Sequence, residues 1–274
     1  MPKLPERIDE AFPDSLGEAE KQEFLEEIRQ ELDKPVKIIG AGQCGVGKST
    51  LLRSIFEINE DDEDIPDWLT DSAVSAETRE FRSHTMETDD GFKIQFTDGP
   101  GLGESISKDE KYLPQWADQI EKHDLFYWVL DASARGAISS VQRNLDYLLN
   151  NTDYENNVVI VMNMVDKIQL PRKERSKHGG DQWNKKYNLP TDKLENQIEK
   201  RTEDIQDKLH SNTGVSKDQM VACSALKRWH NDKVLDKFIE QLPPADRVKM
   251  LAHRDVSDFT ELMNDEVKKN MNFE

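Results

Sequence analysis

Short, almost purely apolar runs alternate with longer segments of helical periodicity over most of the 274-residue chain. The runs at 36–40, 124–130 and 157–162 are apolar at nearly every position, which predicts strands buried on both faces of a parallel sheet. Each run is followed by a segment whose apolar residues recur with helical spacing. The helices expected in this part of the chain are 49–56, 110–122, 139–150, 191–210 and 231–241.

Two further strands are expected around 80–87 and 92–97, joined by turn residues, and a last short strand at 220–223. Strands that alternate with helices of this length indicate an α/β fold with a doubly wound, mainly parallel six-stranded sheet. The pair of strands around the turn would supply one antiparallel edge of that sheet.

Both ends of the chain are expected to be helical appendages. A helical stripe of apolar residues covers 16–32, and a second terminal helix is expected over 258–270. Pro243-Pro244 marks the boundary before that last segment. The expected organisation is an N-terminal acidic helical segment at 1–34, the sheet domain at 35–243 and a C-terminal helical tail at 244–274.

The composition is strongly acidic, with a formal net charge of −18 at pH 7. This charge disfavours non-specific binding to nucleic acid or to an anionic membrane surface. Two cysteines, Cys44 and Cys223, make no disulfide framework and fit a reducing compartment. Because no secretory signal opens the sequence and no apolar run approaches the ~18 residues that cross a bilayer, we expect a cytoplasmic protein without a membrane span.

The segment GQCGVGKS at 42–49 fits the GxxxxGK[ST] phosphate-binding loop and lies between an expected strand and an expected helix. The glycines let successive backbone N–H groups point at a phosphate, to which the following helix presents its positive end. Lys48 would reach the β- and γ-phosphates and the Ser49 hydroxyl would ligate Mg²⁺. The nucleotide-contacting residues expected here are Gly42, Gln43, Cys44, Gly45, Val46, Gly47, Lys48, Ser49 and Thr50.

A second motif, Asp98-Gly99-Pro100-Gly101, follows an apolar strand about fifty residues later. Asp98 can hold a water molecule bound to Mg²⁺, and the Gly101 N–H can meet the γ-phosphate because only glycine allows such a close approach. Release of the γ-phosphate would free this loop, which makes it a candidate switch.

The apolar run VVIVM at 158–162 ends abruptly in Asn163-Met164-Val165-Asp166. In GTP-binding proteins an [NT]KxD loop stands at this point, and its Asp accepts hydrogen bonds from the guanine N1–H and 2-amino groups. Asp166 is placed for that function, Asn163 can tie this loop to the phosphate loop, and Met164 replaces the Lys that usually covers the base. Since a thioether can still pack on the ring, we expect weaker binding but an unchanged preference for guanine over adenine.

A fourth motif, Ser224-Ala225-Leu226, follows the last short strand and matches the SA[KL] loop whose backbone N–H meets guanine O6. These four motifs, in this order, resemble the translation-factor-related GTPases, within the branch typified by Era, TrmE, EngA and the septins, and most of all the small bacterial YfjP-like GTPases. The resemblance covers roughly 20–243. It is carried by SAETREF (75–81), FTDGPGLGES (96–105), DLFYWVLDASARG (124–136) and ACSAL (222–226).

The resemblance implies a Mg²⁺-dependent GTPase in which Lys48, Thr78 and Gly101 serve catalysis. Thr78 looks like the switch residue that ligates Mg²⁺ and senses the γ-phosphate. Leu102 stands where Ras-like proteins carry a water-orienting Gln, so intrinsic hydrolysis is expected to be slow. Gly45 replaces the Asn through which some relatives recruit potassium, and that route is not expected.

Several side features have a functional and a plain interpretation. Arg79 and Arg135 either stabilise phosphates in the manner of an arginine finger or are solvated. Cys44 and Cys223 are expected near the nucleotide, where alkylation would block binding. The basic stretch within 167–190, with Trp183 interleaved, is either a solvated loop or a contact for RNA or the ribosome.

Three functions therefore share the expected fold. They are a nucleotide-dependent switch associated with the ribosome or RNA, a septin-like assembly GTPase that dimerises in the GTP state, and a module that binds guanine nucleotides without hydrolysing them. An unknown protein effector or activator belongs to the first two. An ATPase is disfavoured, because Asp166 would have no adenine partner.

Overall fold

The computed structural model describes residues 17–58, 65–69, 80–88, 91–103, 105–134, 138–153, 158–171, 173, 182–184 and 186–253. They fall into two compact units. The larger unit lies within 37–84 and 96–242, and the smaller unit takes up the described residues before 37, those of 85–95 and those from 243 onward. No described helix is long and apolar enough to cross a membrane.

A six-stranded sheet has the strand order β2-β3-β1-β4-β5-β8. The pairings of β1 with β4, β4 with β5 and β5 with β8 are parallel, with Ile38 opposite Leu125, Phe126 opposite Val158 and Ile160 opposite Met220. The expected mainly parallel, six-stranded sheet is confirmed. The strands are β1 (Val36–Ala41), β2 (Arg82–Glu87), β3 (Lys93–Asp98), β4 (Leu125–Asp131), β5 (Val158–Asn163) and β8 (Met220–Ala222).

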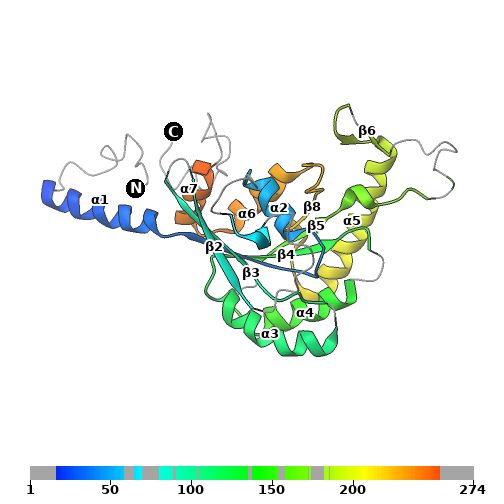
Figure 1. Cartoon of the computed structure of the whole chain (residues 1–274), viewed down its shortest axis with the longest axis horizontal. Helices are drawn as coiled ribbons and strands as arrows, with labels where there is room; N and C mark the ends of the chain where they lie inside the picture. Colours follow the sequence, from blue (N-terminus) through cyan, green and yellow to red (C-terminus); the bar gives the residue numbers. More distant parts are fainter. Residues whose placement is uncertain are drawn as a thin grey trace. The chain divides into compact units, whose positions relative to one another are not determined.

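Helices follow the parallel strands, as expected for a doubly wound fold (Figure 1). α3 packs against α4 and α4 against α5, whereas α2 packs against α6. These helices are α2 (Lys48–Ile55), α3 (Ile106–Ile120), α4 (Ile138–Asn150), α5 (Asp192–Thr213) and α6 (Asn231–Gln241).

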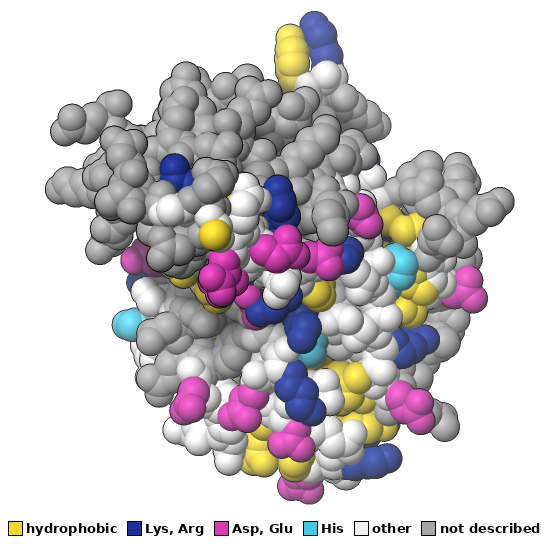
Figure 2. Space-filling model, turned by 90° about the vertical axis from the view of Figure 1, so that its left-hand side faces the viewer, with side chains coloured by type: hydrophobic (Ala, Val, Ile, Leu, Met, Phe, Trp, Pro, Cys, Tyr) yellow, Lys and Arg dark blue, Asp and Glu magenta, His cyan; other side chains and the backbone are white. Residues whose placement is uncertain are grey.

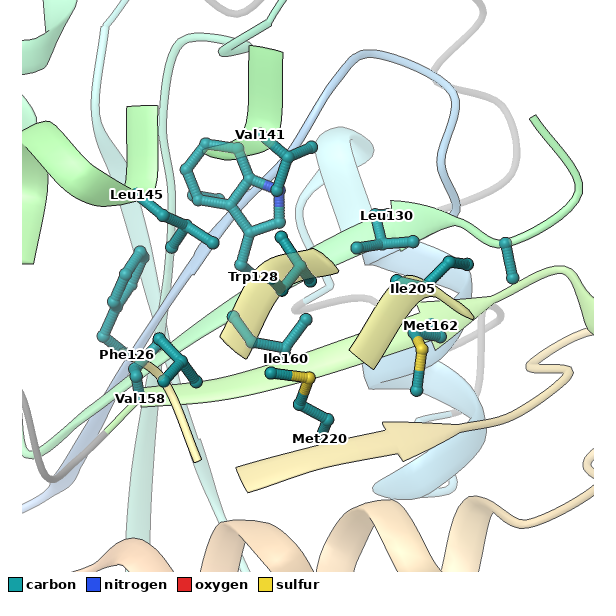
Figure 3. Close-up of a cluster of buried hydrophobic side chains, with 14 of the residues drawn as sticks. Phe126, Trp128, Leu130, Val141, Leu145, Val158, Ile160, Met162, Ile205 and Met220 are labelled. Carbon is teal, nitrogen blue, oxygen red and sulfur yellow. The ribbon is translucent and has the colours of Figure 1, made fainter. Parts of the chain in front are cut away.

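The alternation of side chains along β4 explains how one strand contacts helices on both faces of the sheet. Phe126, Trp128 and Leu130 join a buried cluster with side chains of α4, β5 and α5 (Figure 3). Tyr127 points to the other face, where its ring lies 5.1 Å from that of Phe238 in α6. The all-apolar sequence of this strand therefore reflects burial on both faces, as predicted.

One expected helix start was wrong. The helix expected at 110–122 begins four residues earlier, because the Ser105 hydroxyl caps it by accepting a hydrogen bond from the Lys108 N–H at 3.3 Å. At the expected boundary, Pro243 begins the C-terminal part of the smaller unit, and Pro244 opens helix α7 (Pro244–His253), in which proline is tolerated as the first residue. The expected helix over 258–270 lies outside the described residues.

In the smaller unit, α1 (Glu18–Asp33) matches the expected helix at 16–32. Lys93 forms an ion pair with Asp33 at 2.7 Å. The buried ammonium of Lys249 donates to the Lys34 carbonyl at 3.1 Å and to Asp246 at 2.9 Å. The division into 1–34, 35–243 and 244–274 stays a prediction.

Charged side chains of both signs lie on the described part of one face of the molecule (Figure 2). On the face drawn in Figure 2, Asp and Glu side chains lie interspersed with Lys and Arg. The net negative charge therefore does not gather into one acidic patch there.

Candidate nucleotide-binding site

The phosphate loop connects β1 to α2 and depends on glycine at two close approaches. Gly42 has φ of 145°, and a Cβ there would lie 2.3 Å from the Val129 carbonyl oxygen. Gly47 has φ of 87°, and a Cβ there would lie 2.6 Å from Nδ2 of Asn163. Any other residue at either position would push the loop away from the strands that carry the rest of the site.

Lys48 is the first residue of α2, and its ammonium group lies inside the loop. Its Nζ is 3.4 Å from the carbonyl oxygens of Gly42 and Gln43 and 3.9 Å from Oδ1 of Asp98. The structure thus brings together the two charges that the sequence assigns to the phosphates and to Mg²⁺.

Ser49 and Thr50 lie in the first turn of α2 and are half-buried. The Ser49 hydroxyl donates to the Trp68 carbonyl at 3.0 Å. Because that bond uses the only hydroxyl proton, the lone pairs of Ser49 are left for a cation. The donor set of Ser49 and Asp98 fits Mg²⁺, which takes one or two protein oxygens and completes its shell with phosphate and water. Among the described residues no group of three His, Cys, Asp or Glu forms a separate metal site.

The loop after Asp98 is held against α3. The Trp116 indole N–H donates to the Pro100 carbonyl at 3.0 Å, and the Leu102 N–H meets the Gly42 carbonyl at 3.4 Å. The Leu102 side chain is fully buried in the core cluster. A leucine packed in this way cannot orient a water molecule, in agreement with the expectation from the sequence.

The backbone of Gly103 is held by two side-chain hydrogen bonds that were not predicted from the sequence. Its carbonyl accepts a hydrogen bond from Gln43 Nε2 at 2.5 Å, and its N–H donates to Asp109 Oδ1 at 2.7 Å. The other oxygen of this buried carboxylate accepts from Arg143 at 2.7 Å and from Asn144 at 2.9 Å. The sequence signal was weak, because an Asp in a first helical turn is ordinarily a solvated residue.

Asn163 joins three loops at the end of β5. Its Nδ2 donates to the Val46 carbonyl at 2.9 Å, and its Oδ1 accepts from the Ala225 N–H at 3.0 Å. The expected tie to the phosphate loop is present. If the Ala225 N–H also donated to guanine O6, its single proton would be shared between that oxygen and Asn163 Oδ1. Leu226, the next residue, is exposed.

Asp166 is held by the fourth motif. The buried Ser224 hydroxyl donates to Asp166 Oδ1 at 2.6 Å, and the Val165 N–H donates to the Cys223 carbonyl at 3.3 Å. Met164 adopts the left-handed conformation with φ of 62°, which is uncommon for a residue with a side chain. Its methyl carbon lies 3.6 Å from the position a Cβ would take on Gly47, so Met164 lies beside the phosphate loop.

The two cysteines differ in a way that the sequence did not predict. Cys44 is exposed in the phosphate loop, but Cys223 is fully buried and its thiol points at Asn163 Oδ1, 3.7 Å away. Burial, with the nearby charge of Asp166, raises the pKa of the Cys223 thiol. The expectation of alkylation therefore holds for Cys44 alone, since a buried neutral thiol is inert.

Some expected site residues lie outside the described residues, namely Thr78, Arg79 and Arg135. Asp131, at the end of β4, caps the following loop: its Oδ1 accepts from the N–H and the hydroxyl of Ser133 at 2.8 and 2.6 Å. Of the basic stretch, Lys167, Lys173 and Lys186 are described and exposed.

Comparisons with known proteins agree with this geometry. Residues 37–164 match the family model described as 50S ribosome-binding GTPase. The chain is 29% identical to the uncharacterized protein YkfA of Escherichia coli K12 over 149 residues, which cover 54% of this chain and 48% of YkfA. It is 36% identical to mouse Septin-1 over 78 residues, which cover 27% of this chain and 20% of the septin. The chain thus spans about half the length of YkfA and a smaller part of Septin-1.

Among solved structures, a dimerization-deficient mutant of Toc33 from Arabidopsis thaliana aligns with a TM-score of 0.48 at 14% identity, over 74% of this chain and 76% of that one. The phosphate loop, the loop after Asp98 and the first half of the base loop all lie within the matched residues. Residues 37–164, just under half of the chain, thus match a GTPase family model, and the six-stranded sheet with its flanking helices has the fold of a P-loop GTPase domain.

Proposed function

We propose that the chain binds GTP with Mg²⁺ and hydrolyses it slowly to GDP and phosphate, acting as a nucleotide-dependent conformational switch. One observation carries the proposal. Asn163 bonds both to the phosphate loop and to the loop of Ser224, which in turn holds the Asp166 carboxylate. These bonds support a site in which the Asp166 carboxylate, suited to the guanine N1–H and 2-amino groups, acts together with Lys48 of the phosphate loop.

The described residues suggest how hydrolysis would proceed. Lys48 and the N–H groups of the phosphate loop would hold the charge that develops on the phosphates during in-line attack by water. Ser49 and, through water, Asp98 would hold Mg²⁺, which would supply positive charge to the phosphates. Gly101 and, on the strength of the resemblance, Thr78, which lies outside the described residues, would contact the γ-phosphate, so that its loss releases both switch segments.

The rate without a partner should be low. Since Leu102 is buried and offers no hydrogen bond to water, unassisted turnover is expected below about 10⁻² s⁻¹. A protein activator would then set the lifetime of the GTP state, and an effector would bind the switch segments in that state. We also propose that the protein acts in the cytoplasm.

A ribosome or RNA contact is a finer proposal, supported by the family description and by the exposed cations of 167–190. Tyr187 is exposed beside Lys186, whose ammonium lies 5.0 Å from the ring centroid, as in surfaces that stack on bases. Co-sedimentation with ribosomes that is lost at high salt and lost on Lys186→Glu would support it. Co-sedimentation that neither treatment changes would count against this contact.

A GTP-dependent homodimer is the second candidate, supported by the likeness to Septin-1. Light scattering with GTP, GDP and no nucleotide tests it directly. A mass that doubles only with GTP would support the dimer, and a constant monomer mass would contradict it.

The third candidate is a module that binds guanine nucleotides without hydrolysing them. Multiple turnovers of GTP by the purified protein would exclude it.

The central experiment measures binding of labelled GTP, GDP, ATP and XTP to the wild type, Lys48→Ala and Asp166→Asn. We expect guanine-selective binding that Lys48→Ala abolishes and that Asp166→Asn redirects toward xanthine. Xanthine carries an oxygen in place of the 2-amino group, and an amide can donate to it. Equal binding of ATP and GTP by the wild type would overturn the assignment of Asp166.

A further inference from the structure

The segment between Asp166 and α5 contains a short hairpin that contacts the loop following Ser224. β6 (Trp183–Asn184) pairs antiparallel with β7 (Leu189–Pro190), with Trp183 opposite Pro190. The Asn184 side chain holds the turn by accepting from the Lys186 N–H at 3.0 Å. Asn188, the last turn residue, has φ of 52°, a left-handed conformation that Asn tolerates better than most residues.

Asn188 links the hairpin to the loop of the fourth motif. Its Oδ1 accepts from the Trp183 indole N–H at 3.1 Å, and its Nδ2 donates to the Lys227 carbonyl at 2.5 Å. The Trp183 ring also meets the Trp229 ring edge to face, with 6.1 Å between centroids. One amide side chain therefore uses its acceptor within the hairpin and its donor on the neighbouring loop.

The backbone of Lys227 links this contact to the group that orients Asp166, because its carbonyl accepts from Asn188 and its N–H, in the preceding peptide group, contacts Ser224. The Lys227 N–H donates to the Ser224 hydroxyl oxygen at 3.2 Å, and that hydroxyl donates to Asp166 Oδ1 at 2.6 Å. Ser224 and Trp229 close the loop with two backbone bonds, at 3.0 and 3.1 Å. Because a hydroxyl has one proton, the bond from Lys227 helps to direct that proton at the carboxylate.

We propose that Asn188 is a positioning residue for guanine selectivity, acting through the backbone of Lys227 and the Ser224 hydroxyl on Asp166. This inference rests on the proposed function, in which Asp166 accepts from the guanine N1–H and 2-amino groups. The motifs that define the site do not include the hairpin. Its role is to fix the carboxylate in the plane that allows both hydrogen bonds at once.

Asn188→Asp is the sharpest test. The carboxylate keeps an acceptor for Trp183 and tolerates the left-handed backbone, but it puts an oxygen where Nδ2 faces the Lys227 carbonyl. The matched control is Asn196→Asp on α5, an exposed residue whose amide bonds only to the Asp192 carbonyl of its own helix. Affinities for GDP and IDP are measured on all three proteins. IDP lacks the 2-amino group but keeps the N1–H and all phosphate contacts.

We expect Asn188→Asp to weaken GDP binding about tenfold and IDP binding only about threefold, so that the ratio of GDP affinity to IDP affinity falls. The control should leave both affinities and their ratio unchanged. An equal loss for GDP and IDP, or no loss for either, would overturn the positioning role, because a merely structural defect does not discriminate the 2-amino group.

Asn188→Gly guards against a folding defect of the first variant. It keeps the left-handed backbone and removes both side-chain bonds, so it should lower the GDP/IDP ratio as well. An unchanged ratio in a folded Asn188→Gly protein would overturn the inference. If the wild type itself binds GDP and IDP equally, the assignment of Asp166 fails instead, and the proposed function falls with it.

Discussion

The two halves of the nucleotide site are built in different ways. The phosphate half is local: residues 42–49 form one loop, and its shape depends on glycine conformations within that loop. The base half is assembled from residues far apart in the sequence, since Asn163 bonds to Val46 and Ala225, and Ser224 bonds to Asp166. Damage to the phosphate half should therefore cost affinity alone, whereas damage to the junction of the base half should cost affinity and folding stability together.

The largest effect is expected from Lys48→Ala. Loss of two charge-assisted hydrogen bonds to phosphates should cost about 3–6 kcal/mol of GTP and GDP binding. The free energy of unfolding should change by less than about 1 kcal/mol, because the contacts of Lys48 in the described structure are long, 3.4 Å to two carbonyls and 3.9 Å to Asp98. Fluorescence titration and urea unfolding measure the two quantities. Lys200→Ala, an exposed α5 variant, is the control, and a loss of stability in Lys48→Ala would contradict the contrast.

Asn163→Ala should affect both quantities. The substitution leaves the Val46 carbonyl and the Ala225 N–H without their partner in a buried place, at a cost of about 2–4 kcal/mol in the free energy of unfolding. GDP affinity should fall as well, since the loops drift apart. Urea unfolding of the nucleotide-free protein isolates the first effect. If Asn163→Ala has the same free energy of unfolding as the exposed control Asn196→Ala, then the base half is no more important to folding stability than the phosphate half.

The same contrast explains how far the sequence could predict this molecule. Strands such as 124–130 were predictable because burial on both faces removes polar residues from the sequence. The phosphate loop and the loop after Asp98 were predictable because their chemistry is local. The hydrogen bonds that hold Gly103 could not be predicted, because Asp109, Arg143 and Asn144 come together only through the packing of α3 on α4. Asn188 was missed for the same reason, since its partner Lys227 lies 39 residues away.

Thiol labelling tests the different exposure of the two cysteines. Cys44 is exposed in the phosphate half and Cys223 buried in the base half, so a thiol reagent should modify Cys44 at least about tenfold faster. Bound GDP should slow labelling of Cys44. Mass spectrometry of the modified peptides reads the site, and Cys44→Ser should leave the native protein almost unlabelled. Equal labelling of Cys223 in the folded protein would show that the base half opens readily.

The smallest effect is expected from Met164→Lys, which restores the Lys that the [NT]KxD motif carries at this position and adds a cation beside the expected base site. A cation on an exposed ring contributes about 0.5–1 kcal/mol, so GDP should bind about two- to fivefold tighter. The gain should lie at the low end, because the Lys167 ammonium is 3.2 Å from the Met164 sulfur and would repel a second ammonium there. Adding Lys167→Ala should release the rest of the gain. If neither variant tightens GDP binding, then residue 164 does not cover the base, and the base half depends on Asp166 and its hydrogen-bonded support alone.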